Sequence, residues 1–286
     1  MRIAIPNKGR LKDPALQLLR AIGIKTNSTD ERALIIPTNW KNVELVAVRT
    51  EDIPYIVESG GADLGITGRD YVVESRADVE ELLRLDFGEG LIVFAVPKAW
   101  GVRDVQELRD REIRIATKYP NIVSDYIKEK GLKAKIVRVS GATEVMPYLG
   151  AADAVVDVVN SGTTLKIHGL EPVDTILSTY AVLIANRRWR SKALADKVQL
   201  IVTLIQGVIN AKNKKMLFMN VPSDKLDDVL SVLPAMLAPA ITKLSSANAW
   251  EVITVVEEEL LPTVLNKALE KGARDIVVID IEKVVK

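Results

Sequence analysis

Asp157 and the loop after it have the residue types and spacing of a sugar-phosphate site. Asp157 is the one carboxylate in the apolar run Val155–Val159, and a buried carboxylate is costly unless something hydrogen-bonds to it. In the loop that follows, Gly162 stands among hydroxyl side chains. Such a loop turns its N–H groups inward and holds a phosphate at a helix N-terminus, which leaves Asp157 beside the sugar hydroxyls. A plain strand-to-helix turn with Ser161 as the N-cap fits the same residues.

A second candidate site follows the first predicted strand, residues 2–6. Lys8 and Arg10 flank Gly9, and two cations with a flexible glycine beside a helix start suit a polyphosphate. A solvated surface turn has the same composition, so the residues alone leave both interpretations open.

Smaller polar groups follow two later strands. Arg49 stands at the end of a predicted strand at 43–48, and Thr67-Gly68 offers a second small anion cradle. Asp70 is either a ligand contact or the N-cap of the next helix. His168 is the only histidine, and because no carboxylate is spaced to orient it, we predict a structural role for it.

Alternating strands and helices must position these residues. Asp13, Thr50 and Asn121 are predicted N-caps of helices. Gly65 lies inside a strand, which implies close backbone approach. The remaining predicted elements are strands at 62–66, 91–96, 112–117, 134–139, 155–159 and 175–185, and a helix at 187–212.

The predicted elements form two α/β lobes and a third domain. Lobe I comprises residues 1–91 and 178–212, lobe II comprises residues 92–177, and two crossings between lobes form a cleft where ligands commonly bind. Residues 213–286 are predicted as strands at 216–221, 240–244, 249–257 and 276–281 with helices at 223–233 and 258–271. That βαββαβ order is ferredoxin-like. No residues there suggest chemistry, so we predict a role in assembly or regulation.

Composition excludes several classes of protein. Lys and Arg number 39 against 38 Asp and Glu, so nothing indicates binding to nucleic acid or to a membrane surface. The absence of cysteine excludes disulfides and thiol catalysis. We predict a cytoplasmic protein, because the sequence shows neither a signal peptide nor a membrane span. With one histidine, any metal is a hard ion held by carboxylates and substrate phosphates, which means Mg²⁺.

In combination, four motifs resemble the ATP phosphoribosyltransferases in their long form. The motifs are Asn7-Lys8-Gly9 and the segments 65–68, 116–121 and 157–165; the last resembles the phosphoribosyl pyrophosphate (PRPP) loop of phosphoribosyltransferases. The resemblance implies transfer of the phosphoribosyl group of PRPP to N1 of ATP with release of pyrophosphate, the first step of histidine biosynthesis. It also implies lobes like those of type II periplasmic binding proteins and an ACT-like C-terminal domain. Two stretches depart from the family pattern: Asn160-Ser161, where Ser-Thr is common, and Gly88-Glu89-Gly90, where a Cys-Arg pair is common.

The same resemblance implies residue roles. Asp157 would hold the ribose hydroxyls and Glu144 would lie near the ribose or Mg²⁺. The 5′-phosphate would be held by Ser161, Gly162, Thr163 and Thr164. Cations facing pyrophosphate or triphosphate would be Lys8, Arg10 and Arg49. The ATP side would be completed by Thr67, Gly68 and Asp70. No covalent intermediate is required.

Feedback inhibition by histidine is implied for the C-terminal domain. The matching positions are Asn220, Met236, Ala240 and Asp275; aspartate is common at the first and threonine at the third. The family forms dimers and hexamers, so we expect a homo-oligomer. Two other classes stay open: a purine or pyrimidine salvage phosphoribosyltransferase, and a two-lobed solute-binding protein.

Overall fold

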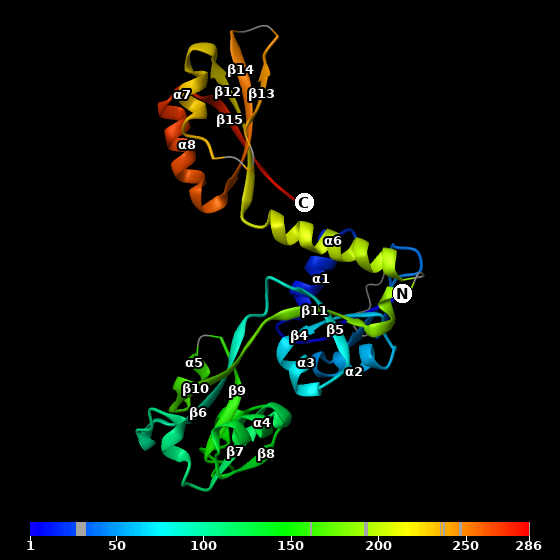
Figure 1. The fold of residues 1–286 in the computed structure, drawn as a ribbon, viewed down its shortest axis with the longest axis vertical. Helices are drawn as coiled ribbons and strands as arrows, with labels where there is room; N and C mark the ends of the chain where they lie inside the picture. Colours follow the sequence, from blue (N-terminus) through cyan, green and yellow to red (C-terminus); the bar gives the residue numbers. More distant parts are fainter. Residues whose placement is uncertain are drawn as a thin grey trace. The chain divides into compact units, whose positions relative to one another are not determined.

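The computed structural model describes residues 1–26, 33–160, 162–191, 194–234, 236, 238–245 and 248–285. The chain divides into two compact units, Met1–Val202 and Thr203–Lys286 (Figure 1). The boundary falls within the long helix α6 (Ala195–Ala211), before the predicted start of the C-terminal domain at residue 213. None of the described helices has the length and apolar character that crossing a membrane requires.

The first sheet of unit Met1–Val202 positions the cationic loops. Its strand order is β2-β3-β1-β4-β11-β5, and β3, β1 and β4 are parallel. The carboxyl ends of parallel strands meet at one edge of a sheet, so the loops after β1 and β3 and the start of α3 gather there. The bounds are β1 (Arg2–Pro6), β2 (Ile35–Pro37), β3 (Glu44–Val48), β4 (Leu64–Gly68), β5 (Val79–Arg84), β11 (Ala181–Asn186), α1 (Lys12–Ala21), α2 (Ile53–Glu58) and α3 (Arg69–Ser75).

Gly65 allows α2 to pack tightly on β4. A Cβ atom at this position would lie 2.6 Å from Cγ2 of Ile53 and 2.8 Å from Cγ2 of Val57. Both of those side chains are fully buried. The close backbone approach that the sequence predicted at Gly65 is therefore confirmed.

The second sheet carries Asp157. Its order is β10-β6-β9-β7-β8, with β9, β7 and β8 parallel and β6 antiparallel to β9. The start of β9 is fully buried on both faces, as its continuous β-branched run requires. The bounds are β6 (Gly90–Pro97), β7 (Ile113–Thr117), β8 (Ala134–Arg138), β9 (Ala154–Val159), β10 (Leu170–Thr179), α4 (Pro120–Lys130) and α5 (Thr163–Ile167).

The chain crosses between these sheets twice, after β5 and after β10. The single strand predicted at 175–185 is wrong: β10 ends at Thr179 in the second sheet, and β11 begins at Ala181 in the first. Apolar periodicity cannot detect this break, because the residues on either side of Tyr180 are buried in their own sheets.

Unit Thr203–Lys286 has the predicted ferredoxin-like order. The sheet runs β13-β14-β12-β15 with every neighbouring pair antiparallel, and α7 and α8 cover one face (Figure 1). Leu217, Met219 and Val221 alternate along β12 and are buried. The bounds are β12 (Lys214–Pro222), α7 (Leu226–Leu230), β13 (Ala240–Lys243), β14 (Ala249–Glu257), α8 (Leu261–Glu270) and β15 (Arg274–Asp280).

Several predicted helix boundaries are wrong. Helix α1 begins at Lys12, before Asp13, and Thr50 opens a 3₁₀ turn. Helix α4 begins at Pro120, so Asn121 is not its N-cap; proline is favoured at the first helical position. The predicted helix 187–212 is a 3₁₀ turn, Arg187–Arg190, and then α6. Strands β2 and β5 were not predicted.

Candidate active site

Three groups converge on the carboxylate of Asp157, which is half-buried near the C-terminal end of β9. The hydroxyl of Thr143 donates to Oδ2, and the N–H of Val158 donates to Oδ1 at 2.7 Å. The ammonium of Lys118 lies 3.2 Å from Oδ1. The carboxylate that looked costly in the sequence is therefore compensated by hydrogen bonds and an opposite charge.

Lys118 is a site residue that sequence reasoning missed. Burial by itself lowers the pKa of Lys118, but the charge and hydrogen bond of Asp157, together with Tyr71 and Asp70, outweigh burial and raise the pKa above its ordinary value. Its side chain is 25% exposed, so a held cation faces the cavity. The available signal was its position directly after β7, the parallel neighbour of β9, where a side chain reaches the same sheet edge.

Glu144 joins the same cluster. The buried Thr143 hydroxyl lies 3.4 Å from Oε2 of Glu144 while it donates to Asp157. Both carboxylates line a cavity of about 250 Å³ whose other walls include Lys118, Gly162, Thr163 and Thr164. The structure therefore brings together the predicted ribose residue, the predicted metal residue and the predicted phosphate loop. Ser161 lies outside the described residues.

Gly162, in the predicted phosphate loop, has a left-handed backbone conformation. Its φ is +70°, and it is the N-cap of α5. A Cβ atom there would meet no other atom within 4 Å, so the backbone faces open space. Glycine adopts this left-handed conformation without the strain that other residues incur.

Of the three predicted cations, Arg10 makes contacts near this cavity. Its Nη1 donates to the carbonyl of Glu89 and to Oδ1 of Asn160, each at 2.9 Å. Asn160 also lines the cavity around Asp157. Lys8 is exposed in the loop after β1, and the side chain of Arg49 is 63% exposed after β3.

The three residues predicted to complete the ATP site, Thr67, Gly68 and Asp70, are buried. Asp70 is 2% exposed; its Oδ2 accepts from the Tyr119 hydroxyl at 2.6 Å and its Oδ1 accepts from Thr179 at 2.8 Å. Thr67 is fully buried and donates to the carbonyl of Thr50 at 2.9 Å, and Gly68 is also buried. Burial and the nearby Asp70 raise the pKa of Tyr119, so its hydroxyl remains a donor.

A second contact ties α3 of the first-sheet region to α4 of the second. The Glu74 carboxylate accepts from the N–H groups of Asn121 at 3.0 Å and Ile122 at 2.9 Å. These are N–H groups of the first turn of α4, which have no partner within the helix. Together with the bonds of Asp70, they fix α3 against the start of α4.

The residues predicted to bind the inhibitor histidine lie in unit Thr203–Lys286. The amide of Asn220 donates to Oδ2 of Asp275 at 3.2 Å, so the structure brings these two together. Ala240 begins β13 at the opposite edge of the sheet. Met236 is 51% exposed between α7 and β13.

Comparison with known proteins identifies the family. The ATP phosphoribosyltransferase family model matches residues 49–207, and the model described as the HisG C-terminal domain matches residues 211–283. The ATP phosphoribosyltransferase of Sulfurisphaera tokodaii is 62% identical over 286 residues, covering 100% of both chains. The chain belongs to the ATP phosphoribosyltransferase family.

Other relatives agree. The ATP phosphoribosyltransferase of Pyrobaculum aerophilum is 50% identical over 285 residues, with 100% of both chains covered. The solved ATP phosphoribosyl transferase (HisG:HisZ) complex from Thermotoga maritima is 27% identical with a TM-score of 0.63, and covers 72% of this chain and 98% of that one. This ATP phosphoribosyltransferase is of the long form, because its C-terminal domain matches the family's own.

The family fixes the reaction. An ATP phosphoribosyltransferase joins the phosphoribosyl group of PRPP to N1 of ATP and releases pyrophosphate, the first step of histidine biosynthesis. The two alternatives that the sequence left open, a salvage phosphoribosyltransferase and a solute-binding protein, are thereby set aside.

Proposed function

We propose that the cavity around Asp157 is the PRPP site of this enzyme. The observation that carries the proposal is the convergence of Asp157, Glu144 and Lys118 on one cavity that the Gly162 loop also lines. The loop N–H groups and the hydroxyls of Thr163 and Thr164, with Ser161, would hold the 5′-phosphate. The Asp157 carboxylate would accept from the ribose hydroxyls.

The reaction breaks the bond between C1′ and a pyrophosphate oxygen and forms a bond between C1′ and adenine N1. The sugar becomes cationic as pyrophosphate departs, so the carboxylates of Asp157 and Glu144 stabilise the ribose. Lys118 orients Asp157 through its ion pair and offers a positive charge toward the departing phosphates. Lys8, Arg10 and Arg49 supply further cations for the phosphate groups. Adenine N1 is a weak nucleophile, so positioning contributes much of the rate.

Mg²⁺ fits this cavity as a partner of the substrate. Glu144 and Asp157 approach the same hydroxyl of Thr143, and Mg²⁺ in such sites uses one or two carboxylates together with substrate phosphates and water. Among the described residues, no group of three or more His, Asp and Glu side chains forms a complete metal site. We infer that Glu144 would hold the ion together with PRPP, where the ion would neutralise pyrophosphate charge.

Asp157→Asn tests the assignment. We expect kcat to fall at least tenfold, because the amide gives up the negative charge beside the developing cation. Asp174→Asn is a matched control: its carboxylate lies 3.2 Å from Lys130, as that of Asp157 lies 3.2 Å from Lys118. If Asp157→Asn keeps kcat and the KM for PRPP within about twofold, or roughly 0.4 kcal/mol, Asp157 is only structural.

We also propose that histidine inhibits the enzyme through unit Thr203–Lys286. Asn220 with Asp275 offers an acceptor for the amino group of the ligand, as the family pattern implies. Ala240 on β13 lies two strand spacings from Asn220 on β12 and three from Asp275 on β15, or about 10 Å and about 14 Å. The distance to Asp275 is too far for one amino acid to span. A site that uses both edges therefore takes them from two copies, which supports a homo-oligomer, either dimer or hexamer.

Steady-state assays with millimolar histidine test the regulatory proposal. We expect the wild-type rate to fall and the Asp275→Ala variant to resist inhibition at unchanged basal rate. An unchanged wild-type rate would mean that this domain serves assembly alone. We further infer that the enzyme acts in the cytoplasm, where a biosynthetic enzyme meets PRPP and ATP.

A further inference from the structure

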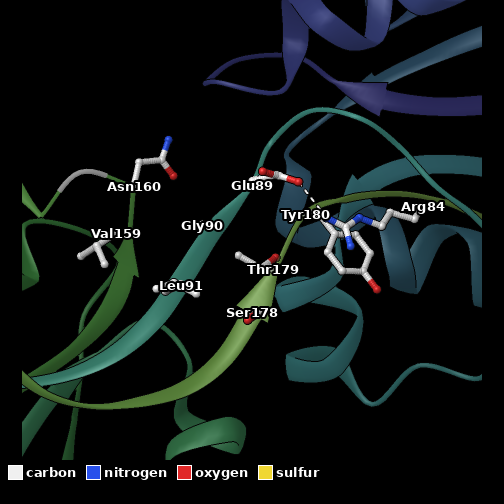
Figure 2. Close-up of a pocket in the computed structure, with 9 residues that line it drawn as sticks. All are labelled: Arg84, Glu89, Gly90, Leu91, Val159, Asn160, Ser178, Thr179 and Tyr180. Atoms are coloured by element: carbon white, nitrogen blue, oxygen red, sulfur yellow. Dashed lines mark hydrogen bonds and ion pairs between the residues drawn. The ribbon is translucent and has the colours of Figure 1, made fainter. Parts of the chain in front are cut away.

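A second, larger cavity adjoins the one around Asp157. Its volume is about 590 Å³, and it shares Val159, the last residue of β9, and Asn160 after it with the smaller cavity. Figure 2 shows its lining extending from these two residues, past Gly90 and Thr179, to Tyr180 and Arg84. This size lies within the range of small-molecule sites, so the cavity has room for a nucleotide.

Arg84 is held in place at the far end of this cavity. Its Cζ lies 4.3 Å from the ring centroid of Tyr180, and its Nη2 lies 2.7 Å from Oε1 of Glu89 (Figure 2). The side chain is still 60% exposed. A guanidinium fixed by a ring and a carboxylate loses little freedom when it binds an anion.

Glu89 also anchors a second guanidinium. Its carbonyl accepts from Nη1 of Arg10 at 2.9 Å, and the same nitrogen donates to Asn160. Arg10 therefore lies toward the end of the cavity that adjoins Asp157, while Arg84 lies at the other end. A ligand that lies along the cavity meets cationic groups near both of its ends.

The chemistry of ATP decides how it lies in this cavity. N1 of adenine and the triphosphate are at opposite ends of the molecule. Because N1 must reach C1′ of PRPP, adenine belongs at the end that Val159 and Asn160 share with the Asp157 cavity. We propose that Arg84, stacked on Tyr180, binds the triphosphate of ATP and selects it over nucleotides with fewer phosphates. This inference rests on the proposed PRPP site.

The proposal predicts that substitutions of Arg84 and of Glu89 affect the affinity for ATP differently. The Glu89 carboxylate competes with the triphosphate for the guanidinium of Arg84. Glu89→Gln should leave ATP affinity unchanged or raise it, whereas Arg84→Gln should lower it. If the ion pair served only the fold, both variants would lower the affinity for ATP to the same extent.

The experiment measures the affinity of the full chain for ATP, ADP and AMP by calorimetric titration. For Arg84→Gln we expect ATP affinity to fall about tenfold, or ~1.4 kcal/mol, with AMP changed less than twofold and ADP between them. Arg187→Gln is the matched control: Arg187 is 57% exposed and pairs with Asp78 at 2.9 Å, against 60% and 2.7 Å for Arg84 with Glu89. The control should bind all three nucleotides as the wild type does.

The assignment of Arg84 would be overturned by an equal loss of ATP and AMP affinity, or by equal losses of ATP affinity in Arg84→Gln and Glu89→Gln. PRPP affinity of Arg84→Gln should match the wild type, and a fall as large as that for ATP would also contradict it. The proposed PRPP site fails separately, if Asp157→Asn leaves PRPP turnover unchanged. Thus each failure is distinguishable from the other.

Discussion

Tyr119→Phe removes one oxygen atom from the buried contact between α3 and Tyr119, the residue before α4. The Tyr119 hydroxyl donates to Asp70 at 2.6 Å, and both residues are buried. Phenylalanine keeps the ring beside Tyr71, whose centroid lies 5.7 Å away, so packing is preserved. The Asp70 carboxylate is left with the Thr179 hydroxyl as its side-chain donor.

The size of the effect follows from this hydrogen bond. A hydrogen bond to a charged group contributes about 1.5–3 kcal/mol to the free energy of unfolding. A loss of 1 kcal/mol lowers the Tm of a domain of this size by roughly 2–4 °C. We therefore expect the Tm of unit Met1–Val202 to fall by roughly 3–12 °C.

Differential scanning calorimetry at neutral pH measures this shift. Tyr148→Phe is the control, because Tyr148 is 87% exposed and its hydroxyl can be replaced by water. We expect the control to melt within 1 °C of the wild type. If Tyr119→Phe also melts within 1 °C of the wild type, the contact between Asp70 and Tyr119 does not stabilise the unit and the reasoning is wrong.

Three further predictions concern single positions. Gly162→Val should lower PRPP affinity at least tenfold by calorimetry, because Gly162 has a φ of +70° in the proposed phosphate loop. The control is Gly150→Val, at a φ of +69° with open space around it, which should bind PRPP normally. Folding raises the pKa of Lys118 above its ordinary 10.5. The charged Lys118 therefore stabilises the folded state fully below pH 10.5, and this stabilisation is lost as the pH rises through the raised pKa. The Tm difference between wild type and Lys118→Met should stay constant from pH 6 to 9 and shrink above about 10.5; a change between pH 6 and 9 would contradict this. Gly65→Ala should destabilise unit Met1–Val202 by about 1–3 kcal/mol in urea unfolding, because its Cβ would lie 2.6 Å from Ile53, and a neutral result would mean that α2 moves freely.

Local patterns in the sequence were sufficient for much of the fold. The order of strands and helices predicted in residues 213–286 indicated the ferredoxin-like domain, and β12 shows the alternating burial that one covered face requires. The bounds of β14 were predicted at 249–257 and are Ala249–Glu257. The apolar run around Asp157 and the glycine that follows it predicted a strand, a loop and a helix, because each of those preferences acts over a few neighbouring residues.

Helix starts were predicted less well. Asp13 and Asn121 looked like N-caps, yet neither caps a helix. At α4 the first N–H groups bond to Glu74, a residue of another helix. A side chain from elsewhere in the fold had taken the place of the local cap, and no local pattern reveals that.

The sequence by itself indicated Asp157 and the loop after it as a candidate site, because these residues lie within a few positions of one another. Only the tertiary structure decided that Asp70 bonds to Tyr119, 49 residues away, and to Thr179, 109 residues away. It also revealed Lys118 beside Asp157 and Arg84 on Tyr180. Such contacts depend on strand order and on the two crossings between sheets, and the energies that select them come from burial and charge pairing across the fold, which periodicity along the chain does not encode.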